Sequence, residues 1–142
     1  MSQIVFPGTQ NADFLVDQVT NAPAQVIDLD QGFAVEGHID FPNWLAGTGN
    51  VSVYADQRGG GYDQKILSKD LTITANPTDP TGTTRYDWTL TYPTDRPSSS
   101  TPLSDPPPPP GSTVYSLTAV FTFNGVLSDV AAFVDMGTYM IN

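Results

Sequence analysis

The sequence predicts an all-β fold of about seven antiparallel strands, an arrangement typical of β-sandwiches and barrels. Runs in which apolar and polar residues alternate recur along the chain, and clusters of Gly, Pro, Asn and Asp separate them. The 142 residues include 13 prolines and 12 glycines but only 14% charged residues, which suits strands and turns better than helices. We therefore expect one domain with almost no helix.

Three strands are predicted in the first half of the chain. "AQVIDL" (24–29) is short and suits an edge strand, whereas "FAVEGHID" (33–40) and "NVSVYAD" (50–56) alternate as half-buried strands do. Gly37 leaves room for a neighbouring side chain. The segment between them, "FPNWLAGTGN" (41–50), contains a proline and two glycines, so we expect a loop there.

Four further strands are predicted beyond residue 58. The glycines of "RGGGYDQ" (58–64) indicate a turn, and "KDLTITA" (69–75) and "RYDWTLTY" (85–92) follow as strands. The long Pro- and Ser-rich connection 93–112 excludes a helix or a central strand. The last two predicted strands are "TVYSLTAVFTF" (113–123) and "VAAFVDMGTYMIN" (130–142), the latter broken or bulged at Gly137.

The stretch "PPGSTVYSLTAVFTFNG" resembles the sixth strand of bacterial immunoglobulin-like and fibronectin III-like domains. A Pro-Gly turn precedes a tyrosine, and small polar residues then alternate with apolar ones. The resemblance implies an antiparallel immunoglobulin-like β-sandwich over residues 24–142. It also implies that Gly111 ends the turn and that the Tyr115 hydroxyl bonds to backbone a few residues upstream. The chain lacks both cysteines of antibody domains, and Trp44 falls in a predicted loop.

Residues 1–23, which include "QIVF" and "DFLVDQV", have two interpretations. They form either an arm that pairs with the edge strand of a neighbouring subunit or the first strand of the same domain. The sequence leaves both open.

The net charge of −10 argues against two classes of partner. Residues 1–57 hold seven acids and no Lys or Arg, and residues 97–142 hold three acids and no base. Because both ends would repel phosphate, we expect neither nucleic-acid binding nor attachment to anionic membrane. The acidity favours solubility, with attraction of a basic partner or Ca²⁺ as the alternative.

The absence of cysteine and the hydropathy of the chain argue against cysteine-based sites and membrane-spanning segments. With no cysteine there is no disulfide, thiolate zinc site or cysteine nucleophile. We see no classical signal peptide and no apolar run long enough to span a bilayer. We expect a soluble protein made in the cytoplasm, with release as part of an assembly left open.

The catalytic candidates are few. His38, the only histidine, shares its predicted strand face with Glu36 and Asp40, but no nucleophile or orienting partner is evident, so we expect a solvated face. No G-x-S-x-G elbow is present. A carboxylate pair could hydrolyse glycosides, but a domain of this size hardly forms the deep cleft that this needs. We therefore predict that the protein is not an enzyme.

Two ligand sites are candidates. Asp28 and Asp30 in "IDLDQG" resemble the start of a calcium loop, but the EF-hand spacing is missing, and a tight turn with Asp–backbone bonds is the alternative. We expect no cofactor other than Ca²⁺. Trp44, Tyr54 and Tyr62 are candidates for stacking sugar rings, whereas Tyr86 and Trp88 belong to the apolar face of their strand.

The five prolines of "SDPPPPPGS" either present a ligand to a partner or stiffen a loop of the fold. A polyproline II run can dock in an aromatic groove. Many such ligands have basic flanking residues, whereas the flank here carries an acid and no base. A stiff loop loses less entropy on folding, so we favour a structural role.

From these observations we expect a non-catalytic structural or protein-interaction module, an accessory subunit of a larger or homo-oligomeric assembly. By analogy of fold, the assembly would be bacterial or phage-like. A carbohydrate-binding sandwich, assisted by Ca²⁺ or not, is the main alternative. A second alternative is that the chain is a fragment of an enzyme and acts only together with another chain.

Overall fold

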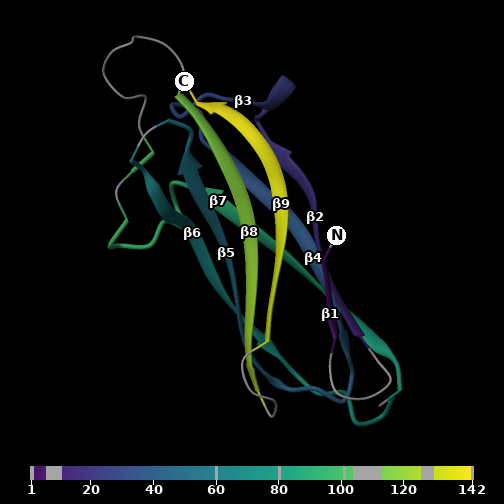
Figure 1. The fold of residues 1–142 in the computed structure, drawn as a ribbon. Coiled ribbons are helices and arrows are strands. Elements are labelled where there is room, and N and C mark those ends of the chain that lie inside the picture. The colour runs from purple at the N-terminus through teal and green to yellow at the C-terminus, as the bar shows by residue number, and fades with distance from the viewer. Residues whose placement is uncertain are drawn as a thin grey trace.

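The computed structural model describes residues 2–5, 11–59, 61–79, 81–100, 102–103, 113–125 and 130–141. In this part the protein is all β: two sheets and one three-residue 3₁₀ turn, Pro23–Gln25 (Figure 1). The described residues contain no helix with the length and apolarity that a bilayer-spanning segment requires.

The first sheet has four strands, all antiparallel to their neighbours. Their order is β1 (Ser2–Val5), β2 (Asn11–Thr20), β4 (Phe33–Pro42) and β7 (Thr83–Tyr92). Strand β2 therefore lies between β1 and β4 of its own chain. Both β1 and β2 come from residues 1–23, and they explain why the sheets hold more strands than the predicted seven.

The second sheet has five strands. Their order is β3 (Val26–Ile27), β9 (Val130–Ile141), β8 (Thr113–Gly125), β5 (Gly47–Gln57) and β6 (Asp63–Ile73). Strand β3 is the short edge strand predicted within residues 24–29, and it runs parallel to β9, while the other pairs are antiparallel. Figure 1 shows β8, β9 and β5 curving side by side in front of β4 and β7.

The core lies between the two sheets, and phenylalanines from both meet in it. The Phe14 ring of β2 lies 5.8 Å from the Phe121 ring of β8, and Phe41 of β4 lies 5.1 Å from Phe123. The predicted alternation is confirmed on four strands. Of their inward residues, Tyr86 is half-buried against the core, and the following are buried: Phe33, Val35, Ile39, Val51, Val53, Ala55, Trp88, Leu90, Tyr92, Tyr115, Leu117, Ala119, Phe121 and Phe123.

Gly37 accommodates the largest core side chain of the four-stranded sheet. It pairs with Trp88 across β4 and β7, and a Cβ on Gly37 would overlap the Trp88 ring and the Leu15 carbonyl oxygen. The Trp88 ring instead packs on Phe14, with 5.6 Å between ring centroids. The predicted role of this glycine is thus confirmed.

Two strands begin earlier than the sequence predicts. Strand β5 starts at Gly47, within the predicted loop 41–50, and β6 starts at Asp63 although residues 58–64 were expected to be a turn and the strand to begin at 69. Opposite Val53 and Tyr54 the register of β6 shifts by one residue, so that Ile66 and Leu67 are both buried. This bulge breaks the alternation on which the sequence prediction depends.

A second bulge interrupts β9 where the sequence predicts it. Leu117 pairs with Gly137 and Thr118 with Asp135, which leaves Met136 as the extra residue. Gly137 has φ of +91°, and its N–H donates to the Asp135 carboxylate at 2.9 Å. Glycine adopts this backbone conformation without strain, so the prediction is confirmed.

The turn after β7 covers the edges of both sheets. The N–H of Ser68 in β6 donates to the Asp95 carbonyl at 3.0 Å, and the N–H of Thr91 in β7 donates to the Asp95 carboxylate at 2.8 Å. Lys69 lies 3.7 Å from that carboxylate and donates to the Thr89 carbonyl. Backbone groups that an edge strand would otherwise expose are thereby bonded within the chain.

We expect Asp95→Ala to lower the free energy of unfolding by about 1–2 kcal/mol, because the Thr91 N–H loses its charged acceptor. Urea denaturation measures the change. Asp95→Asn keeps an oxygen that can accept the Thr91 N–H, so this variant should recover more than half of the stability that Asp95→Ala loses. Equal stability of the alanine variant and the wild type would contradict this role of Asp95.

The described part of the 93–112 connection consists of turns and irregular backbone, as predicted. The five prolines and Gly111 lie outside the described residues. Within the described part, the Tyr92 hydroxyl accepts the Leu103 N–H at 3.0 Å, and Leu103 is buried. The connection is thus attached to the core at Leu103.

Candidate functional site

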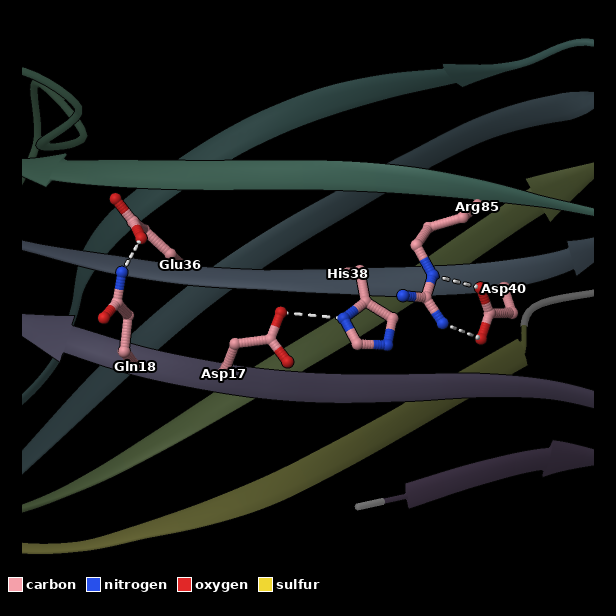
Figure 2. Close-up of polar contacts among 6 residues, drawn as sticks. All are labelled: Asp17, Gln18, Glu36, His38, Asp40 and Arg85. Carbon is pink, nitrogen blue, oxygen red and sulfur yellow. Dashed lines mark hydrogen bonds and ion pairs between the residues drawn. The ribbon is translucent and has the colours of Figure 1, made fainter.

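The outer face of the four-stranded sheet carries polar residues in one-to-one pairs. Figure 2 shows that the three polar residues of β4 each bond to a neighbouring strand: Glu36 to Gln18, His38 to Asp17 and Asp40 to Arg85. The His38 Nδ1 lies 2.7 Å from the Asp17 carboxylate, and the Arg85 Nε lies 2.9 Å from Asp40. The Asp40 carboxylate raises the pKa of Arg85, chiefly through their hydrogen bond.

This pairing differs from a catalytic arrangement. A general base needs a nucleophile or water that it can deprotonate, and an orienting group on its other side. His38 has Asp17 as a partner, but no Ser, Thr or Tyr hydroxyl is recorded at hydrogen-bond distance from its ring among the described residues. Glu36 and Asp40 are occupied by Gln18 and Arg85 instead of His38.

A groove of about 400 Å³ lies beside these pairs. Its lining is mainly polar and acidic: Asp17, Gln18, Glu36, Gly37, Asp87, Trp88 and Thr89. Among the described residues, no group of three or more His, Cys, Asp or Glu side chains is arranged to hold a metal ion.

Asp28 and Asp30 form a tight turn ahead of β4. The Asp30 N–H donates to the Asp28 carboxylate at 3.0 Å, and the Gln31 N–H donates to the Asp28 carbonyl at 3.2 Å. These are the aspartate–backbone bonds that the sequence offered as the alternative to calcium.

The outer face of the five-stranded sheet has a different character. Phe133 on β9 is 69% exposed, the largest exposed fraction among the large hydrophobic residues that the structure describes. It pairs with Val120 on β8, which pairs in turn with Ser52 on β5. Tyr54, 36% exposed, lies two residues after Ser52 on the same face of β5. This face thus presents an aromatic and aliphatic centre.

A polar network fixes the β5–β6 side of that face. The Asn50 amide donates to the Ser68 hydroxyl and to the Asp70 carboxylate, both at 2.9 Å, and Ser52 also bonds to Asn50. Ser52 is only 2% exposed, so its hydroxyl is held within the surface. Such bonded hydroxyl and amide groups are rigid, and ordering them on binding costs little entropy.

The three aromatic candidates for sugar stacking are placed separately. Trp44, 38% exposed, follows β4 at the end of the molecule where β8 and β9 join, and Tyr54 lies near the middle of β5 with Lys65 5.7 Å above its ring. The Tyr62 ring packs edge-on against the buried Tyr115 at 5.6 Å. Tyr62 therefore belongs to the margin of the core.

Burial next to other phenols changes the acidity of Tyr62. Burial is the largest of the causes that raise the pKa of Tyr62 to about 12; Tyr92 and Tyr115 add to it, and Arg96 opposes it. Unfolded tyrosine titrates near 10. The fold therefore favours the neutral phenol, and this contribution is complete below pH 10 and is lost as pH rises toward 12.

We expect ultraviolet titration of the phenol groups to show a tyrosine that ionises at about pH 12, and Tyr62→Phe to remove that step. The wild-type stability should also begin to fall above about pH 10, more steeply than that of the phenylalanine variant. Unchanged titration curves in the two proteins would contradict this environment for Tyr62.

Tyr115 lies at the start of β8, as the corner tyrosine of the resemblance would. Its ring is 1% exposed and pairs across the sheet with Gln57 and Tyr139. The upstream backbone bond of its hydroxyl remains a prediction. Tyr92, an inward residue of β7, does bond to backbone: its hydroxyl accepts the Leu103 N–H.

No protein-family model matches the chain, and no curated protein sequence is significantly similar to it.

Two residues with notable surroundings, the exposed Phe133 and the buried Asn43, were not predicted from the sequence. Phe133 lies in the segment 130–142, whose alternation changes phase at the Gly137 bulge, so its outward direction is hard to predict. Asn43, 4% exposed, lies in the predicted loop 41–50, where an asparagine is ordinary. Reading the alternation separately on each side of Gly137 would have placed Phe133 outward.

Proposed function

We propose that the protein is a non-catalytic immunoglobulin-like module that associates with protein partners through the outer face of its five-stranded sheet. In this proposal it is an accessory subunit of a homo-oligomeric or larger assembly, and it needs no cofactor. The observation that carries the proposal is the exposed Phe133 of β9, which lies beside Val120 of the central strand β8 on a mainly uncharged sheet face.

The strand order supports the immunoglobulin-like part of the proposal. In that fold, strands A, B and E form one sheet, and G, F, C and C′ form the other. Strands β2, β4 and β7 correspond to the first set, and β9, β8, β5 and β6 to the second. Tyr115, at the start of β8, then occupies the position of the corner tyrosine.

The charge distribution on the five-stranded sheet supports an interaction face. Protein interfaces have a centre depleted of charge and enriched in aromatic residues, within a polar rim. The centre consists of Ser52, Tyr54, Thr118, Val120, Thr122 and Phe133. Charged side chains lie toward its margins: Asp56, Arg58, Lys65, Asp70 and Asp135.

The outer face of the four-stranded sheet is a less suitable interface. Its acids and Arg85 extend across the middle strand, so a partner would have to remove several charges from water. Their one-to-one pairing also supports a role without catalysis. We therefore assign association to the opposite face.

Sedimentation velocity of the full chain over a dilution series tests the proposal. We expect reversible self-association that strengthens as salt is added, because salt screens the repulsion between copies of charge −10. Phe133→Ser should weaken association by about tenfold or more, as loss of a central aromatic does. Trp44→Ser, at an exposed aromatic elsewhere, is the matched control and should associate normally.

A wild-type protein that stays monomeric at every concentration and salt level would contradict self-association. Association that Phe133→Ser leaves unchanged would contradict the assigned face.

A further inference from the structure

The turn after β4 and the loop after β6 form one unit at the end of the molecule opposite the C-terminus (Figure 1). The Asn76 N–H donates to the Asn43 carbonyl at 2.7 Å, and the Asn43 N–H donates to the Gly82 carbonyl at 2.9 Å. Trp44 is the residue after Asn43 and is 38% exposed. The tryptophan is therefore presented by backbone that two loops hold in place.

The Asn43 side chain strengthens this unit from inside. Its amide nitrogen donates to the Asp79 carbonyl at 2.9 Å, and its amide oxygen accepts the Thr84 hydroxyl. With both backbone groups also bonded, every polar group of this buried residue has a partner. A loop whose polar groups are satisfied in this way loses little entropy when a ligand binds.

An exposed carboxylate lies beside this unit. Asp79 lies over Gly82, where a Cβ would collide with its carboxylate and lie 3.0 Å from the Asn43 amide nitrogen. The Asp79 carboxylate has no recorded side-chain bond or ion pair within the described residues, and it is exposed. Thr78, whose hydroxyl donates to Asn76, is exposed on the same loop.

We propose that these two loops bind a neutral pyranose sugar, with Trp44 stacking on the ring and Asp79 accepting hydrogen bonds from its hydroxyls. An indole face matches the apolar C–H face of a pyranose, and a carboxylate can accept two hydroxyl groups at once. The negative charge of Asp79 and of the whole chain disfavours uronic and sialic acids. The inference is independent of association through the five-stranded sheet.

The two tryptophans make the test specific. Trp88 is 3% exposed, so iodide should quench the fluorescence of Trp44 and leave that of Trp88 almost unchanged. The full chain is first screened on an array of neutral and acidic glycans, and the methyl glycoside of the best-bound neutral sugar is then titrated in solution. We expect that sugar to protect Trp44 from iodide.

Matched variants distinguish binding at this site from non-specific binding of sugar to exposed aromatic residues. By calorimetry, Trp44→Ala and Asp79→Ala should each weaken binding by about tenfold or more. Tyr54→Ala removes an aromatic of nearly equal exposure, 36% against 38%, from the sheet face and should bind normally. Trp88 emission that iodide still cannot quench shows that each variant is folded.

Three results would overturn the inference: no neutral glycan bound by the wild type, acidic glycans bound in preference to neutral ones, or binding that survives Trp44→Ala within about twofold. Sedimentation of the same variants reports on self-association separately, so either proposal can fail while the other stands.

Discussion

Gly37→Ala should lower the free energy of unfolding by more than about 3 kcal/mol, or prevent folding altogether. The added Cβ would meet the Leu15 carbonyl oxygen of β2 on one side and the Trp88 ring of β7 on the other, with the ring carbon Cε2 at 2.7 Å. Neither can withdraw, because β2 and β7 both pair with β4 and Trp88 is packed on Phe14. Chemical denaturation followed by Trp88 fluorescence measures the loss.

Gly61→Ala is the matched control. It makes the same chemical change at a glycine where a Cβ would have no atom within 4 Å. We expect a change of less than about 0.5 kcal/mol there. If both variants were equally stable, the claim that β2, β4 and β7 approach too closely at Gly37 to admit a Cβ would be contradicted.

Asn43→Ala has the second-largest expected effect, a loss of about 2–3 kcal/mol. The substitution removes both side-chain hydrogen bonds and leaves the Asp79 carbonyl and the Thr84 hydroxyl without their partner. Because Asn43 is 4% exposed, water replaces those bonds poorly. Thermal or urea denaturation measures the loss.

Asn50→Ala provides the comparison for Asn43. Asn50 also bonds through its side chain, to Ser68 and Asp70, but on the outer surface of the sheet where water can replace it. We expect a loss below about 1 kcal/mol. An equal or smaller loss at Asn43 would contradict its role as the residue that joins the two loops.

The sequence predicts the strands best where one face is buried without interruption. In β8, five inward residues from Tyr115 to Phe123 alternate without a break, and all five are buried. The prediction was weaker where a bulge changes the phase, as at Ile66 and Leu67, because two adjacent residues then face the core. Strand partners depend on contacts far apart in sequence, so strand β2 remained one of two interpretations.

The candidate surfaces were predictable only in part, for a related reason. A place in the loop 41–50 does not by itself give the exposure of Trp44, because Asn43 and Leu45 on either side of it are buried. The burial of Tyr62 likewise depends on Tyr115, far away in sequence. The pairing of His38 with Asp17 also depends on the register of β2 against β4. Residue type and spacing indicate which face of a strand is polar, but they do not identify the cross-strand partner.

Nuclear magnetic resonance of the wild-type chain over a dilution series in high salt tests the assigned interaction face most directly. We expect amide shifts to change with concentration around Val120 and Phe133 on β8 and β9, and to stay constant around His38 on β4. Phe133→Ser should move these changes to concentrations about tenfold higher or more. Shifts that move on the outer face of the four-stranded sheet, or that do not depend on concentration at all, would contradict the assigned face.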